Sequence, residues 1–182
     1  KYLDLKHVSV SLNMMSNQPS SESIEVTKLV NGGYGLAYYH KRPLFIPKTV
    51  PGDHVQVLLT RKKKYYSFAK VIRYIKKSPL RQLDTCIHSN ECGGCQFQDI
   101  DYSNQLNLKQ DCLHDTITHD APFLLPYLKP IIPCKTTHYH RNKMEFAFYQ
   151  SESLELGLKE QLNPTSVIPV SQCLLMSEAS ND

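Results

Sequence analysis

Three cysteines crowd into one short stretch of the chain, at Cys86, Cys92 and Cys95. Two glycines separate the last two, and their missing Cβ atoms let the backbone turn tightly around a small group. Thiolates this close repel one another unless a cation neutralises them, and soft thiolate ligands select zinc or iron–sulfur clusters. The spacing, Cys-x5-Cys-x2-Cys, lies one residue from the plant-type ferredoxin pattern, which uses a distant fourth cysteine. The stretch therefore predicts three ligands of a metal site that a remote cysteine completes.

Three other cysteines are candidates for the fourth ligand. Cys112 lies on the flank of a predicted helix and is interpreted as a small buried apolar residue. Cys134 has His138 and His140 close by, which leaves a second, zinc-like site as an alternative, although no further thiol accompanies them. Cys173 begins an expected helix, whose N-terminal dipole stabilises a thiolate. Cys173 is therefore the predicted fourth ligand.

A basic run suggests contact with a nucleic acid. Arg61, Lys62, Lys63 and Lys64 stand together in a predicted hairpin, directly before Tyr65. Lysine and arginine neutralise phosphates, and tyrosine rings offer stacking platforms for bases. The alternative is a solvated hairpin tip whose lysines keep a sheet edge soluble.

The elements that must position these residues are mostly β. Residues 24–79 contain five short stretches with the alternating or continuous apolar pattern of β-strands, separated by glycine-rich turns. This pattern predicts a small closed barrel of the OB type. Residues 101–118 are predicted to form a helix capped by Asp101. Its expected apolar stripe is Tyr102, Leu106, Leu113 and Ile117.

The rest of the chain predicts a second small sheet. Residues 119–136 contain four prolines and are expected to be a connecting loop. Alternation over residues 139–148 and 154–159 predicts a hairpin, followed by a short strand at 167–168. The fold class predicted is thus mostly β with some α: an OB-like barrel followed by an α/β central domain with a cysteine metal loop.

Composition limits the class of protein. The 182 residues are 41% hydrophobic and 21% charged, which excludes wholesale disorder, and a net charge of +4 permits nucleic-acid binding. Residues 1–22 are expected to be a flexible lead-in without the apolar core of a secretion signal, and no apolar run is long enough to span a membrane. Crowded cysteines favour metal-bound thiols in a reducing cytoplasm over a disulfide scaffold.

An ordered series of motifs resembles the N-terminal part of the RNA (uracil-5-)-methyltransferases that carry a TRAM domain and a [4Fe–4S] cluster, a family that includes enzymes acting on 23S rRNA. The series covers residues 24–176 and consists of Pro51-Gly52-Asp53, Ser78-Pro79-x-Arg81, the Cys86–Gln96 run, Tyr102-x2-Gln105-Leu106-x2-Lys109, Arg141 to Phe146, and Cys173-x-Leu175.

This resemblance implies a domain organisation and a function. Residues 23–80 would be the TRAM barrel, and residues 81–182 a central domain that ends before a methyltransferase domain. The cluster ligands carried over are Cys86, Cys92, Cys95 and Cys173, while Cys112 and Cys134 do not match.

The partner implied is RNA, either rRNA or tRNA, gripped by the basic hairpin and by Arg141 and Lys143. The parent protein would use S-adenosylmethionine to methylate uracil at C5. This chain would contain neither catalytic nor cofactor-binding residues, and would be inactive alone and monomeric. The alternative from another class is a stand-alone, zinc-stapled nucleic-acid-binding protein, because four thiolates suit either metal.

Overall fold

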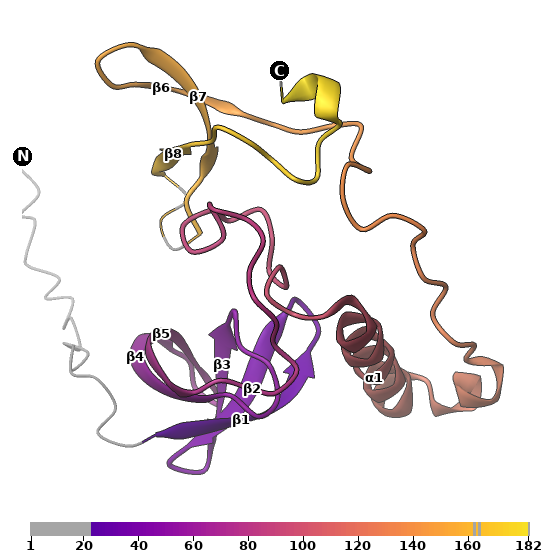
Figure 1. Cartoon of the computed structure of the whole chain (residues 1–182). Helices are drawn as coiled ribbons and strands as arrows, with labels where there is room; N and C mark the ends of the chain where they lie inside the picture. The colour runs from indigo at the N-terminus through magenta and orange to yellow at the C-terminus, as the bar shows by residue number, and fades with distance from the viewer. Residues whose placement is uncertain (1–22, 162, 164, 182) are drawn as a thin grey trace, which may run out of the picture.

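The computed structural model describes residues 23–161, 163 and 165–181. The predicted lead-in, residues 1–22, lies outside the described residues. The described part contains a barrel, a long helix beside it, and a small sheet reached by an extended connection (Figure 1).

Five strands close into the barrel in the order β1-β2-β3-β5-β4. β3 and β5 pair in parallel, and the other neighbours are antiparallel. The prediction of a mostly β fold with a small closed barrel is confirmed. The strands are β1 Ile24–Val30, β2 Tyr34–Tyr39, β3 Arg42–Pro47, β4 His54–Lys62 and β5 Ser67–Lys76.

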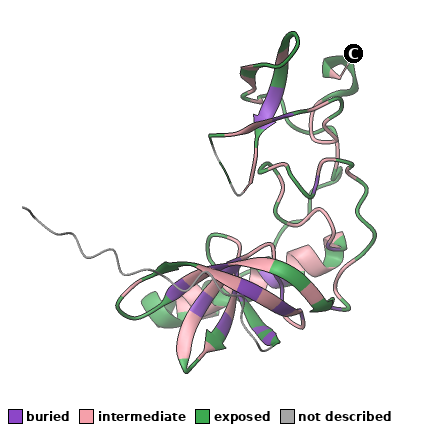
Figure 2. Ribbon diagram, turned by 90° about the vertical axis from the view of Figure 1, so that its left-hand side faces the viewer, coloured by how far each residue is buried: buried purple, intermediate pink, exposed green. Residues whose placement is uncertain are grey.

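The barrel core follows from the two-residue period of its strands. Alternate residues point inward and are almost completely buried, as the purple stripes of Figure 2 show. Residues between them point outward, so Phe45 lies on the outside between the buried Leu44 and Ile46. The core residues are Ile24, Val26, Ala37, Leu44, Ile46, Val55, Val57 and Ala69.

Helix α1, Tyr102–Asp120, begins where the sequence predicts, because the Asp101 side chain accepts a hydrogen bond of 2.9 Å from the Ser103 amide. The predicted apolar stripe is wrong in its details. Leu108 is the buried residue and packs in a second core with Leu29 and Ile100, whereas Leu113 is 47% exposed. Only a narrow strip of the helix surface is therefore buried, around Leu108. No helix in the described part of the chain is long and apolar enough to cross a membrane.

The connection after α1 contains a short 3-10 helix, η1 Pro122–Tyr127, within the predicted loop. It leads to a three-stranded antiparallel sheet of β6 Ala147–Gln150, β7 Leu154–Lys159 and β8 Val167–Pro169. The predicted hairpin and third strand are present, but the first strand starts at residue 147 and not at residue 139. A second 3-10 helix, η2 Glu178–Ser180, follows.

Candidate metal centre and RNA-binding surfaces

The structure brings the four predicted metal ligands to one place. Cys86, Cys92, Cys95 and Cys173 line a single cavity, although Cys173 comes from a distant part of the chain. The rest of the wall is largely apolar and consists mainly of Met144, Leu158, Val170, Leu174 and Leu175. A mostly apolar shell around a group of thiols limits the access of water to whatever the thiols hold.

The cysteine loop is held against the end of β7. The Gly93 amide donates to the Lys159 carbonyl at 3.0 Å, and the Gln161 amide donates to the Glu91 carbonyl at 2.9 Å. Cys92 forms an isolated antiparallel bridge with Glu160. A Cβ on Gly93 would lie 3.1 Å from the Lys159 oxygen, so this close backbone approach favours glycine.

Cys173 is held by long-range contacts and not by a helix, so the helix predicted at Cys173 is wrong. Residues 174–175 form a turn, and the Leu174 and Leu175 carbonyls accept hydrogen bonds of 2.8 Å from the amides of Tyr139 and Arg141. The Asn181 side chain accepts from the Cys173 amide at 2.8 Å and donates to the Cys173 carbonyl at 3.2 Å. The thiol is therefore positioned without the helix dipole that the sequence suggests.

Burial raises the thiol pKa of two of the four cysteines, Cys86 and Cys95. Burial raises the pKa of Cys86, and a hydrogen bond with the backbone of His88 opposes this effect. Burial also raises the pKa of Cys95, and the charges of Cys92, Cys173 and Cys86 raise it further, whereas Arg141 lowers it. The shared cavity places the two distant segments beside one another. A bound cation would offset the repulsion among thiolates here.

The donor set is one that suits an iron–sulfur cluster or a zinc ion. Four cysteines around one largely apolar cavity are the donor set that a [4Fe–4S] cluster requires. The described residues contain no group of three or more His, Cys, Asp or Glu side chains that converges as a site for a metal ion. The ligand assignment thus stays a prediction, and the observation that supports it is that all four cysteines line one cavity.

The other two cysteines lie elsewhere. Cys112 is half-buried on α1, and its thiol pKa is raised, first by burial and then by Asp115. Cys134 is exposed, and its sulfur contacts the Thr136 carbonyl at 2.9 Å. Neither lines the four-cysteine cavity.

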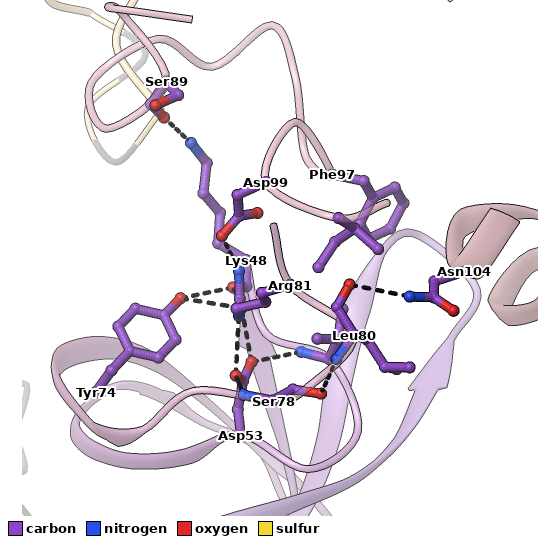
Figure 3. Close-up of polar contacts among 12 residues, drawn as sticks. Lys48, Asp53, Tyr74, Ser78, Leu80, Arg81, Ser89, Phe97, Asp99 and Asn104 are labelled. Carbon is purple, nitrogen blue, oxygen red and sulfur yellow. Dashed lines mark hydrogen bonds and ion pairs between the residues drawn. The ribbon is translucent and has the colours of Figure 1, made fainter. Parts of the chain in front are cut away.

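A buried ionic network joins the barrel to the segment that leads into the cysteine loop (Figure 3). The Arg81 guanidinium donates from Nε to Asp53 Oδ1 at 2.9 Å and from Nη2 to Asp53 Oδ2 at 2.6 Å, and it also pairs with Asp99. The side chains of Arg81 and Asp53 are 6% and 0% exposed. A further Arg81 bond reaches the Lys48 carbonyl at 2.8 Å, and the Lys48 ammonium donates to the Ser89 carbonyl.

This network explains two motifs that lie far apart in the sequence. Asp53 Oδ1 accepts from the Ser78 amide at 2.9 Å, and the Ser78 hydroxyl donates to the Pro51 carbonyl at 2.6 Å. Pro51-Gly52-Asp53 and Ser78-Pro79-x-Arg81 are therefore two halves of one buried polar cluster. Both motifs are visible in the sequence, but no local pattern indicates that they touch.

Tyr74 belongs to this network and gives it a pH dependence. Its hydroxyl donates to the Lys48 carbonyl at 2.7 Å, and burial raises its pKa from 10.0 to about 12. Arg81, whose carbon Cζ lies 4.9 Å from the ring centroid, partly opposes this shift. Between these two pKa values the unfolded chain has lost the proton that the folded chain keeps, so stability must fall as the pH rises through this window.

We expect Tyr74 to reduce the free energy of unfolding by on the order of 2 kcal/mol between pH 10 and 12. Urea unfolding at the two ends of this window measures the loss, and a Tyr74→Phe variant should show a smaller one. Tyr65→Phe, at a tyrosine that is 70% exposed, is the matched control and should behave like the original chain. Equal pH dependence in Tyr74→Phe and the original chain would contradict the assignment.

The basic run lies at the tip of the β4–β5 hairpin, as predicted. Arg61, Lys62 and Lys64 are exposed, and the Lys64 ammonium lies 5.0 Å from the centroid of the Tyr65 ring. Arg42 supports the tip from β3, because its Nη2 donates to the carbonyls of Lys63 and Lys64, each at 2.7 Å. The hairpin thus exposes its charges on a turn that the Arg42 hydrogen bonds stabilise.

Arg141 and Lys143 are exposed at a second place, a hollow of about 800 Å³ between the barrel and the small sheet. The barrel contributes residues 32–34 and Pro47 to its wall, and the cysteine loop contributes Gly93, Gly94 and Gln96. Lys143 pairs with Glu145 at 3.0 Å. The hollow adjoins the cysteine loop, so the predicted RNA-binding pair Arg141 and Lys143 lies beside the predicted metal site.

Comparison with known proteins defines the class of the barrel. Residues 23–80 match the family model of the TRAM domain of tRNA (uracil(54)-C(5))-methyltransferase. A solved structure of the Pyrococcus abyssi tRNA (uracil-54, C5)-methyltransferase in complex with S-adenosyl-L-homocysteine has the same fold. The TM-score is 0.57 at 21% identity, over 87% of this chain and 34% of that one. The barrel is thus similar to a TRAM domain in both sequence and fold.

Curated relatives extend the similarity beyond the barrel. An uncharacterized RNA methyltransferase of Thermotoga maritima is 32% identical over 162 residues, which are 88% of this chain and 36% of the relative. The 23S rRNA (uracil(1939)-C(5))-methyltransferase of Shewanella denitrificans is 31% identical over 86% of this chain and 34% of the relative. The chain spans about a third of the length of these relatives. The resemblance to the TRAM-bearing RNA (uracil-5-)-methyltransferases is confirmed for the part of the family that this chain covers.

Proposed function

We propose that this chain is the RNA-binding, [4Fe–4S]-carrying part of an S-adenosylmethionine-dependent RNA uracil-C5 methyltransferase that acts on rRNA or tRNA in the cytoplasm. The observation that supports the proposal most is the joint presence of a TRAM barrel and a four-cysteine cavity in one chain. The parent protein would transfer the methyl group. This chain by itself would bind RNA, as a monomer, without modifying it.

The residues that would hold the cluster are Cys86, Cys92, Cys95 and Cys173. A cluster bound there would supply folding energy, because it would join the cysteine loop to the segment around Cys173. His88 already links the same two segments, since its Nε2 accepts from the Ser171 amide at 3.3 Å. The cluster would thus stabilise the wall of the hollow that carries Arg141 and Lys143.

The RNA-binding half of the proposal is tested by removing the hairpin charges. We expect a Lys62→Ala, Lys63→Ala, Lys64→Ala variant to bind single-stranded RNA more weakly. The dependence of log affinity on log salt concentration should flatten by roughly 0.7 for each phosphate that is no longer neutralised, or about 2 for all three lysines. Fluorescence anisotropy of a labelled RNA over a salt series measures both quantities.

The matched control changes Lys129 and Lys135, exposed lysines outside the barrel, to Ala and should leave the slope close to its original value. If the triple variant bound RNA as tightly as the original chain, with the same slope, the hairpin would be only a solubilising tip. If the original chain bound no RNA, the proposed function itself would be refuted.

A further inference from the structure

The outside of the barrel carries a belt of four aromatic rings that none of the predicted sites includes. Tyr34 comes from β2, Phe45 from β3, Phe68 from β5, and Tyr66 directly precedes β5. Strand alternation places Phe45 and Phe68 outside, because each stands between two buried neighbours, such as Ser67 and Ala69 around Phe68. Neither barrel core cluster contains them.

The four rings form one continuous surface. Centroid distances are 6.4 Å for Tyr34–Phe45, 5.6 Å for Tyr34–Phe68, 5.5 Å for Phe45–Tyr66 and 5.7 Å for Tyr66–Phe68. Three of these pairs meet close to perpendicular, at 75°, 81° and 80°. Tyr34, Phe45 and Phe68 are half-buried, and Tyr66 is 36% exposed. Rings that meet edge to face present aromatic surface in more than one direction.

The belt connects the two basic places already described. At one end, Tyr34 is part of the wall of the hollow that holds Arg141 and Lys143. At the other end, Tyr66 belongs to the basic hairpin, because its carbonyl accepts a hydrogen bond of 2.8 Å from the Lys63 amide. Positive charge therefore lies at both ends of an aromatic path, and this charge is complementary to a polyanion.

We propose that the belt of Tyr34, Phe45, Tyr66 and Phe68 is a stacking platform for unpaired bases, over which a single-stranded RNA segment runs from the basic hairpin into the hollow. The proposal rests on the proposed RNA-binding function and makes it specific. Stacking needs bases whose faces are free, and a duplex hides those faces within its own stack. The platform would thus select single-stranded over double-stranded RNA without reading sequence, since every base has a π-face.

The test removes one ring and leaves the charges in place. Tyr66→Leu is expected to weaken binding of a short single-stranded RNA about tenfold, the size of one base–aromatic stack, while the slope against salt stays unchanged. Tyr66→Phe keeps the ring and should bind like the original chain. Tyr127→Leu, at an exposed tyrosine of η1 outside the belt, is the second control and should also bind normally. Thermal melting of each variant verifies that the barrel is folded.

Comparing the lysine variant with Tyr66→Leu separates the stacking platform from the broader proposal that the chain binds RNA. Weaker RNA binding in the lysine variant, with unchanged binding in Tyr66→Leu, would leave RNA binding intact and overturn the platform. A duplex of the same sequence bound as tightly as the single strand would overturn it too. A single-stranded RNA carrying 2-aminopurine should change its fluorescence on binding to the original chain, and this change should shrink in Tyr66→Leu.

Discussion

Replacing Cys173 by serine is expected to remove most of the iron and acid-labile sulfide from the protein, as is each of the changes Cys86→Ser, Cys92→Ser and Cys95→Ser. All four thiols line one cavity, so each change would remove one bond to the cluster. Loss of Cys173 would also remove the link between the cluster and the distant segment. The measurement is iron and sulfide per chain, together with absorbance near 400 nm, after anaerobic purification. The original chain should contain about four iron atoms.

Cys112→Ser and Cys134→Ser are the controls, because neither residue lines the four-cysteine cavity, and they should retain the full iron content. A fully loaded Cys173→Ser variant would remove Cys173 from the ligand set. A colourless original chain that contains zinc would favour the alternative of a zinc-stapled binding protein. Each result is distinguishable from simple misfolding by the far-ultraviolet circular dichroism of the barrel.

Local sequence patterns are sufficient to predict the barrel but not the segment around Cys173. Val55 and Val57 stand at alternate positions of one strand, so local spacing is sufficient to predict that both are buried. Leu174 and Leu175 form an apolar run that resembles a helix start. Their carbonyls instead bind residues more than thirty positions earlier, a pairing that no local pattern reveals. Cys173 nevertheless lines the same cavity as the other three cysteines, although the helix dipole that favours it in the sequence is absent.

The first strand of the small sheet is shorter than predicted for a related reason. Met144 and Phe146 alternate with polar residues as strand residues do, yet pairing with β7 begins only at Ala147 opposite Gly157. Beyond that point the cysteine loop, through Gly93, bonds the end of β7. Residues 143–146 line the hollow instead. Alternation shows which residues could form a strand, but the available partner edge decides where the strand begins.

Arg81→Met is expected to lower the free energy of unfolding by roughly 3–5 kcal/mol, the cost of removing one partner of a buried ion pair. Asp53 is fully buried, and without the guanidinium the amides of Val50 and Ser78 would still donate to its carboxylate but would bring no positive charge. The side chain of Met has a similar length and no charge, so the loss reports mainly the unpaired carboxylate. Urea unfolding followed by circular dichroism measures it. Lys143→Met, which breaks an exposed pair, should change stability by less than about 1 kcal/mol.

A double-mutant cycle decides whether the loss comes from Asp53 itself. Arg81→Met combined with Asp53→Asn should be less destabilised than the sum of the two single changes, because the second change removes the charge that the first leaves unpaired. Strict additivity would mean that Arg81 acts through Asp99 and the Lys48 carbonyl instead. Since Arg81 joins the barrel to the chain that leads to Cys86, its loss should also allow the cysteine loop to move relative to the hairpin. We therefore expect Arg81→Met to weaken RNA binding even under conditions in which the barrel remains folded.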